Sequence, residues 1–281
     1  MQRLLNQPAS SYTDVETRQT IVTVYLSKKP NGLTLRRALH TGLKQINDCG
    51  LRTGRSRISL QKVRREDWAE SWKRHFRPIE IGSALLIKPG WVKRRPRKNQ
   101  AVVVLDPGLS FGTGQHPTTE FCLSQLAARR DRNHRQSVLD IGTGSGILAI
   151  AAAKLGYAPV FAFDFDIAAA RIARANARRN RVSEKIRIRR ADITRLPKQS
   201  AARYDIICAN LTSNLLIAEV KRIRGRLKPR GALVLAGILK TEFGIVQNAY
   251  RDAGLVMVSS RIGNEWQSAV FQFMDSAKKF H

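Results

Sequence analysis

The sequence predicts an α/β protein: a mainly parallel sheet with helices on both faces and an antiparallel hairpin at one edge, preceded by a small α+β domain. Two observations predict the main sheet and its hairpin. From residue 101 onward, short runs of Val, Ile, Leu and Ala alternate with helical patterns, which is typical of parallel strands buried on both sides. The last two runs, 255–262 and 268–274, lie too close together for a helical crossover and predict the hairpin.

The first 65 residues predict the small domain. Residues 20–26 are rich in β-branched side chains and predict a strand, and residues 33–46 repeat apolar side chains at helical spacing. Residues 57–63 again have the pattern of a strand. We therefore expect a β-α-β order over about residues 15–65.

A helix and a linker follow the small domain. Trp68, Trp72 and Phe76 recur every four residues, which places them on one helical face that packs into a core. Residues 88–100, KPGWVKRRPRKNQ, are basic, broken by proline and without an apolar period, so they predict a turn or linker. The chain is therefore expected to consist of three segments: residues 1–65, 66–100 and 101–281.

Six apolar runs predict the other strands of the main sheet. Each is bounded by turn residues or by a helical pattern. The helical patterns between the later runs favour parallel pairing. The six runs are residues 101–106, 137–142, 159–164, 186–190, 204–210 and 232–237.

The charge balance is strongly basic. The chain has 50 Lys and Arg residues against 21 Asp and Glu, a formal net charge of +29, and residues 1–100 hold 22 of the basic and 7 of the acidic side chains. A positive field of this size attracts polyanions, so RNA or a particle built from RNA is an expected neighbour. The alternative is a general basic bias carried by solvated helix faces.

The sequence gives no signal of membrane insertion or secretion. No apolar run approaches the roughly 18 residues that a membrane span needs, and residues 1–20 lack the apolar core of a signal peptide. We expect a soluble, cytoplasmic protein with no membrane contact. Cys49, Cys122 and Cys208 lie far apart without CxxC spacing, which predicts buried thiols in a reducing compartment and no metal site.

A glycine-rich turn follows the second apolar run. Residues 140–146, DIGTGSG, have the spacing GxGxG, and Ile147 stands where a dinucleotide fingerprint requires glycine. Such a turn lets a ligand approach bare backbone at the carboxyl end of a strand. The carboxylate of Asp140 would repel a pyrophosphate but suits a ligand with ammonium and sulfonium charges. The loop therefore predicts S-adenosyl-L-methionine as cofactor, with Asp140, Gly142 and Gly144 in its site, on a class I methyltransferase (Rossmann-like) fold.

Three acidic residues follow later strands at the same sheet edge. Asp164 stands where a carboxylate accepts both ribose hydroxyls of an adenosine, and the alternative is a plain strand-end turn. Asp192 is placed to meet the adenine amine, and the alternative is a helix cap or an ion pair. Asp166 is expected to cap the following helix.

Asn210 ends the run 204–210 and lies beside the expected reactive end of the cofactor. Its amide oxygen is suited to accept a hydrogen bond from an incoming amine, and the alternative is an Asn that closes a strand and caps a helix. Enzymes that modify a flipped base place an aromatic residue three positions later, where this chain has Ser213. The pattern therefore argues against adenine in nucleic acid as the methyl acceptor.

Longer motifs carry a resemblance to a known family. They are DPGLSFGTGQHPTT (106–119), DIGTGSGILAIAAAKLG (140–156), Asn210, EDWAESWKRHF (66–76) with its following PGW, LAGIL (235–239) and Glu265-Trp266. In these motifs the chain resembles the PrmA family, bacterial methyltransferases that modify the stalk-base protein eleven of the large ribosomal subunit. Residues 1–65 match the family only in their expected β-α-β order.

The resemblance implies a set of cofactor-binding residues. Thr119, Gly142, Asp164 and Asn210 would contact the cofactor. Thr119 rests on the family pattern alone, and a helix cap is the other interpretation of this threonine. His116 is interpreted as a hydrogen-bonding turn residue. The same pocket would be lined by the turn residues Phe111, Gly112, Thr113 and Gly114.

These observations predict an S-adenosylmethionine-dependent protein methyltransferase. The resemblance implies that its substrates are amino groups, lysine side chains and the N-terminal amine, of a ribosomal protein of the large-subunit stalk base, and that the first domain recognises this protein. Asn210 is the expected catalytic residue, and a contact between the basic surface and ribosomal RNA is a further expectation. The alternatives are an RNA methyltransferase and a non-catalytic RNA-binding assembly factor.

Overall fold

The computed structural model divides the chain into two compact units, Met1–Trp72 and Lys73–His281. Each unit is described separately below. The predicted boundaries at residues 65 and 100 stay predictions. The residues that the structure describes are 9–13, 20–24, 26, 30–48, 57–59, 78–106, 116–131 and 133–274.

The first unit contains an antiparallel strand pair and a helix. Strands β1 (Ala9–Thr13) and β2 (Thr20–Val24) pair antiparallel, and helix α2 (Gly32–Asp48) begins where Asn31 Oδ1 accepts hydrogen bonds from the next turn. The helix and β2 confirm two predicted elements, and β1 was not predicted. In the third predicted element, residues 57–59 have no regular secondary structure and residues 60–63 lie outside the described residues, so this strand stays a prediction. The predicted helix with Trp68, Trp72 and Phe76 also lies outside them.

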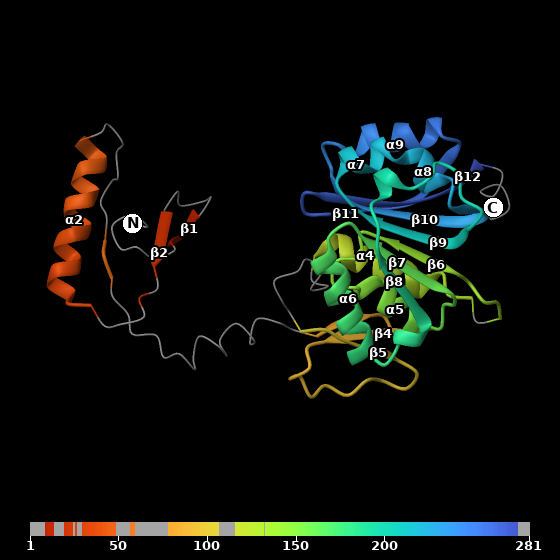
Figure 1. Cartoon of the computed structure of the whole chain (residues 1–281), viewed down its shortest axis with the longest axis horizontal. Coiled ribbons are helices and arrows are strands. Elements are labelled where there is room, and N and C mark those ends of the chain that lie inside the picture. Colours follow the sequence, from red (N-terminus) through yellow and green to blue (C-terminus); the bar gives the residue numbers. More distant parts are fainter. Residues whose placement is uncertain are drawn as a thin grey trace. The chain divides into compact units, whose positions relative to one another are not determined.

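The second unit is built around a seven-stranded sheet in the order β11-β12-β10-β9-β6-β7-β8 (Figure 1). Strands β10, β9, β6, β7 and β8 are parallel, and β12 pairs antiparallel with both β10 and β11. The class I methyltransferase fold and its edge hairpin are thus confirmed. The strand bounds are β6 (Val138–Ile141), β7 (Val160–Asp164), β8 (Ile186–Arg190), β9 (Tyr204–Asn210), β10 (Leu227–Leu239), β11 (Leu255–Gly263) and β12 (Trp266–Phe273).

Helices cover both faces of this sheet and bury two apolar clusters (Figure 1). Apolar side chains of α4, α5 and α6 lie in one cluster, and those of α7, α8 and α9 lie in the other. Short 3-10 helices η2 (Ser183–Lys185) and η3 (Ile193–Arg195) flank β8. The helix bounds are α4 (Pro117–Ala128), α5 (Ile147–Leu155), α6 (Ile167–Arg179), α7 (Ser213–Ala218), α8 (Val220–Arg224) and α9 (Phe243–Asp252).

One predicted strand belongs to a different sheet. The run 101–106 was expected in the main sheet, but its strand β5 (Ala101–Val104) pairs parallel with β4 (Leu85–Lys88), which pairs antiparallel with β3 (Ile79–Ile81). The prediction was wrong because an apolar run indicates a buried strand but not its partner. Asn180, at the end of α6, bonds both the N–H and the carbonyl of Val104 and so ties this small sheet to the main fold.

Within the described ranges, no helix has the length and apolar character needed to cross a membrane. Cys122 and Cys208 are buried free thiols, as predicted, and Cys49 lies outside the described residues.

Candidate active site

The glycine-rich loop between β6 and α5 is attached to the neighbouring strand β7. The backbone N–H groups of Gly142 and Thr143 both donate to the carbonyl of Phe163, at 3.0 Å each. The N–H of Gly144 donates to Oδ2 of Asp164 at 2.9 Å. The structure therefore brings together two of the predicted site elements, the loop and the acidic strand end.

Gly142 is the position where the loop requires glycine. Its φ of +71° lies in the left-handed region, and a Cβ there would come within 2.5 Å of Leu211 Cδ2. Leu211 follows Asn210 at the end of β9. The missing side chain of Gly142 thus lets the end of β9 approach the loop closely.

Asp140 lies beneath the loop, with 1% of its surface exposed. Its Oδ2 accepts a 2.6 Å hydrogen bond from the hydroxyl of Thr143. Burial raises the pKa of Asp140 to about 6, hydrogen bonds from Thr143 and the backbone N–H of Ala149 limit the rise, and the nearby charge of Asp164 adds to it. Asp140 therefore organises the loop and supplies negative charge close to it.

Asp164 is positioned by the loop and by the start of α6. While Oδ2 bonds Gly144, Oδ1 accepts the N–H of Asp166 at 3.0 Å. Asp166 in turn caps α6 by accepting the N–H of Ala168, as predicted. A carboxylate oxygen accepts more than one hydrogen bond, so Asp164 keeps the capacity to bind ribose hydroxyls.

Two exposed apolar side chains beside Asp164 were missed by the sequence analysis. Phe165 is 71% exposed and Ile167 is also exposed, directly after the acidic strand end. An adenine ring next to a ribose needs an apolar surface, and these side chains provide one. The sequence did contain an indication of this surface, because Phe165 is an aromatic residue that directly follows the strand end at Asp164.

Asn210 lies at the end of β9 and contacts the start of α4. Its Nδ2 donates to Oγ1 of Thr118 at 3.3 Å, and Thr118 Oγ1 lies 2.7 Å from Nδ1 of His116. The His116 ring meets the edge of Trp266, with centroids 5.0 Å apart. His116 is thus the hydrogen-bonding turn residue that was predicted, and Thr118 is a site residue to which the sequence analysis gave no role.

The carbonyl side of the Asn210 amide faces β10. A Cβ at Gly237, whose φ is +81°, would lie 2.9 Å from Asn210 Oδ1 and 2.6 Å from the carbonyl of Leu211. Gly237 is the glycine of the LAGIL motif, and only its missing side chain leaves room for the amide. It is a second site residue that the spacing of the motif did not identify.

The remaining predicted residues are Thr119, Asp192 and four residues of the predicted turn before α4. Thr119 is buried in the first turn of α4, next to Thr118, and its N–H donates to the carbonyl of His116. Asp192 caps η3 by accepting the N–H and the hydroxyl of Thr194, and Arg195 Nε lies 3.8 Å from its Oδ2, so the alternative interpretation of a cap and ion pair describes it. Four predicted residues lie outside the described residues: Phe111, Gly112, Thr113 and Gly114.

The donor set at this edge fits S-adenosyl-L-methionine. Burial and, to a smaller extent, the charge of Asp164 raise the pKa of Asp140. A cationic ligand stabilises this buried negative charge, whereas a pyrophosphate would be repelled by it. The backbone of the loop, the ribose-binding carboxylate and the apolar surface after it complete the site. The fold and the site define a class I S-adenosylmethionine-dependent methyltransferase.

Comparisons with known proteins identify the family. A family model described as "Ribosomal protein L11 methyltransferase (PrmA)" matches residues 2–274. A relative from Streptococcus thermophilus named ribosomal protein L11 methyltransferase is 32% identical over 265 residues, which cover 94% of this chain and 82% of the relative. This chain belongs to the PrmA family.

A solved structure supports the same assignment. The ribosomal protein L11 methylase from Lactobacillus delbrueckii subsp. bulgaricus superposes with a TM-score of 0.63 at 27% identity, covering 70% of this chain and 99% of that one. The resemblance seen in the motifs is therefore confirmed over the fold as well.

We predict that Asp140→Asn stabilises the protein near pH 7 and weakens cofactor binding. The folded-state pKa of about 6 lies above the ordinary value of 3.8, so the protonated form stabilises the fold below about pH 4 and this contribution is lost as the pH rises through about 6. At pH 7 the buried charge costs about 3 kcal/mol, which Asn removes while still accepting the Thr143 hydroxyl.

Urea unfolding at pH 5 and pH 7 measures this effect, and calorimetry measures the affinity for S-adenosyl-L-methionine. The wild-type affinity is expected to fall as the pH drops below 6, and that dependence is expected to disappear in the variant. A variant that is less stable at pH 7, or that binds the cofactor as tightly as wild type, would contradict the role of Asp140.

Proposed function

We propose that this protein methylates amino groups, lysine side chains and the N-terminal amine, of its ribosomal protein L11. The match of the family model to residues 2–274 carries the proposal, because it spans both compact units and not only the methyltransferase fold. The relative from Streptococcus thermophilus carries the L11 substrate in its name. Asn210 provides an amide oxygen that can accept a hydrogen bond from the amine that is methylated.

The chemical task is to present a neutral amine in the right orientation. S-adenosyl-L-methionine supplies a methyl group that its sulfonium already activates, so the site needs alignment and no catalytic dyad. A lysine amine has a pKa near 10.4 in water and is cationic at pH 7, so it must lose a proton before it can attack. A desolvated site lowers the amine pKa and so favours the neutral form.

Asn210 is suited to orient that amine. Because Nδ2 donates to Thr118, the oxygen Oδ1 is the atom left to accept a hydrogen bond, and it has no hydrogen-bond partner among the described residues. An amine N–H that donates to Oδ1 directs the nitrogen lone pair away from Asn210. Asn210 is neutral and acts by position, and the proton released by the amine passes to water.

Thr118 and His116 act as positioning residues in this proposal. The contact between Thr118 Oγ1 and His116 Nδ1 fixes the hydroxyl, and the hydroxyl fixes which end of the Asn210 amide faces the acceptor. Trp266 packs against the His116 ring from β12. The orientation of one amide thus depends on three separate elements of the fold.

The alternative acceptors fit less well. Ser213, at the position where base-modifying enzymes place a stacking aromatic residue, is buried and offers no ring. An RNA methyltransferase is therefore not favoured. A non-catalytic assembly factor is not favoured either, because the glycine-rich loop, Asp164 and Asn210 lie at the same edge of the sheet.

Finer assignments complete the proposal. We assign recognition of the ribosomal protein to residues 1–65 and methyl transfer to residues 101–281. Residues 66–100 connect these segments and also contribute β3 and β4 to the second unit. Basic side chains on the surface of the protein contact ribosomal RNA next to the ribosomal protein. The protein acts in the cytoplasm, where ribosomes are assembled.

We predict that Asn210→Ala lowers turnover about 100-fold, because the amine loses its orienting acceptor. The affinity for S-adenosyl-L-methionine, measured by calorimetry, is expected to change by about threefold at most. Thr118→Val, which removes only the hydroxyl, should lower turnover by about tenfold, and Thr118→Ser should restore it. If Asn210→Ala weakens cofactor binding and leaves the turnover of bound cofactor unchanged, the proposed role is wrong.

The substrate assignment is tested with tritiated S-adenosyl-L-methionine and the full chain. Purified large-subunit ribosomal proteins and, separately, ribosomal RNA are offered as acceptors. We expect label in the L11 protein alone, and mass spectrometry then locates the methylated amines. Label in RNA but not in protein, or label in neither, would overturn the proposal, and Asn210→Ala serves as the matched inactive control.

A further inference from the structure

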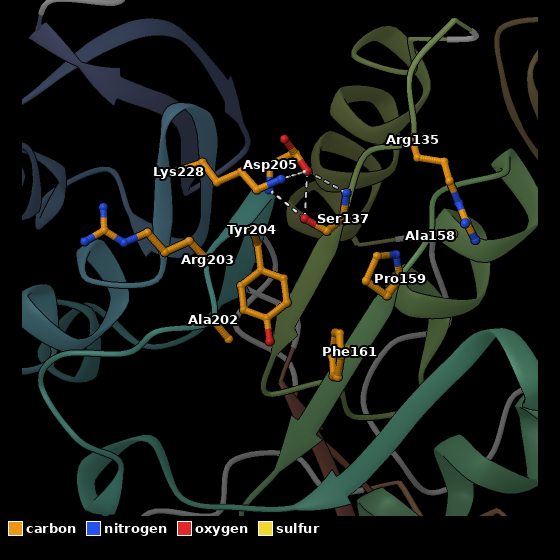
Figure 2. Close-up of a pocket in the computed structure, with 10 residues that line it drawn as sticks. All are labelled: Arg135, Ser137, Ala158, Pro159, Phe161, Ala202, Arg203, Tyr204, Asp205 and Lys228. Carbon is orange, nitrogen blue, oxygen red and sulfur yellow. Dashed lines mark hydrogen bonds and ion pairs between the residues drawn. The ribbon is translucent and has the colours of Figure 1, made fainter.

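A pocket opens at the amino-terminal ends of the parallel strands (Figure 2). It has a volume of about 450 Å³ and is lined by residues that precede or begin β6, β7 and β9, among them Ser137, Pro159 and Arg203. The cofactor loop, Asp164 and Asn210 lie at the carboxyl ends of the same strands. The pocket is therefore at the opposite edge of the sheet, and its volume lies within the range of small-ligand sites.

The pocket combines aromatic rings with cationic side chains. Phe161 and Tyr204 meet edge to face with centroids 5.5 Å apart and form an apolar wall (Figure 2). Arg135 and Arg203 are exposed lining residues, and neither has an ion-pair partner in the part of the chain that the structure describes. The third lining cation, Lys228, is already paired with Asp205 at 2.7 Å, so the free charge of the pocket is positive.

The aromatic wall continues into an arginine-rich edge of the sheet. Arg187 of β8 lies over the Phe161 ring, 5.6 Å from its centroid, and pairs with Phe161 across the two strands. Arg189 is two residues further along β8, on the same face. Strand β8 is the last of the sheet, and both Nε and Nη2 of Arg174 donate to its Ile188 carbonyl at 3.1 Å.

Basic side chains are concentrated around β8. Residues 171–190 hold nine basic side chains and one acidic side chain, and all nine basic residues are exposed. Arg187 and Arg189 of β8 lie on the face of the sheet that carries Phe161, whereas α6 covers the other face of β8, where Ile186 and Ile188 pack. Among the described residues, only Arg179 of the nine forms an ion pair, with Asp106. The other cations repel one another unless a polyanion neutralises them.

Eight of the nine basic residues are arginines. A guanidinium binds phosphate through two parallel hydrogen bonds and stacks on aromatic or base planes, which a lysine ammonium does not. Exposed arginines beside aromatic rings are the combination that holds single-stranded nucleic acid. A single-stranded nucleic acid carries a negative charge and a planar base in every nucleotide, which matches both the arginines and the aromatic ring.

We propose that the face formed by the pocket and by Arg187 and Arg189, here called the arginine face, binds single-stranded RNA. One unstacked base enters the pocket beside the partly exposed ring of Phe161, which the buried Tyr204 ring supports edge to face, and the phosphates on either side lie on the arginines of β8 and of the pocket rim. The strands between this face and the cofactor loop have four to seven residues, or about 13–23 Å. RNA bound here leaves the methyl-transfer site open, and the inference does not depend on which protein is methylated.

The test measures binding of a fluorescein-labelled single-stranded RNA of about 12 nucleotides to the full chain by fluorescence anisotropy. The variant is Arg187→Gln with Arg189→Gln, and the matched control, Lys221→Gln with Arg251→Gln, removes two exposed charges on α8 and α9. The loss of one phosphate contact lowers the affinity for RNA about fivefold at about 0.1 M salt, so the double variant should bind RNA about 25-fold more weakly. Its slope of log Kd against log salt should fall by about 1.4, and the control should stay close to wild type.

A second variant, Arg135→Gln with Arg203→Gln, tests the pocket. It should weaken single-stranded RNA more than a duplex of the same sequence, because only an unpaired base enters the pocket. Failure to bind RNA, equal losses in the Arg187/Arg189 variant and the control, or competition by polyglutamate as effective as that by unlabelled RNA would overturn the proposal. The methylation of isolated ribosomal proteins by each variant is measured separately and should be unchanged. A failure of the proposed methyl transfer is therefore distinguishable from a failure of RNA binding at the arginine face.

Discussion

The candidate site depends on the attachment of the glycine-rich loop to β7. Three backbone N–H groups, of Gly142, Thr143 and Gly144, hold the loop against the end of that strand. A hydrogen bond contributes about 0.5–1.5 kcal/mol net, and one to a carboxylate contributes more, so Asp164 is the strongest attachment point. Because Leu211 then packs where Gly142 has no side chain, the same loop also sets the position of the end of β9.

This arrangement buries a carboxylate, and a buried negative charge destabilises the folded protein. Asp140 is buried beneath the loop, and this burial, together with the nearby charge of Asp164, raises the pKa of Asp140. A fold without a ligand gains nothing from this buried charge. A cationic ligand at the loop stabilises the buried charge of Asp140. The charge that destabilises the ligand-free fold therefore strengthens the binding of a cation. The arginine face, at the opposite edge of the sheet, has an excess of positive charge.

The sequence predicted the parts of the site that lie within short segments. The spacing of the loop and the acid that ends β7 identified Gly142 and Asp164, because both follow strands in a regular pattern. Thr118 was not identified as a partner of Asn210, since the two are 92 residues apart and only the folded sheet brings them together. The strand at Ala101–Val104 was assigned to the wrong sheet for the same reason, because periodicity reports burial and not the pairing partner.

Isothermal titration calorimetry of the full chain with S-adenosyl-L-methionine, and separately with the oxidised nicotinamide dinucleotide, tests the central claim most directly. The negative charge beneath the loop predicts saturable binding of the sulfonium cofactor at one site per chain and no measurable heat from the dinucleotide. Tight binding of the dinucleotide, with no response to S-adenosyl-L-methionine or its demethylated product, would contradict the account.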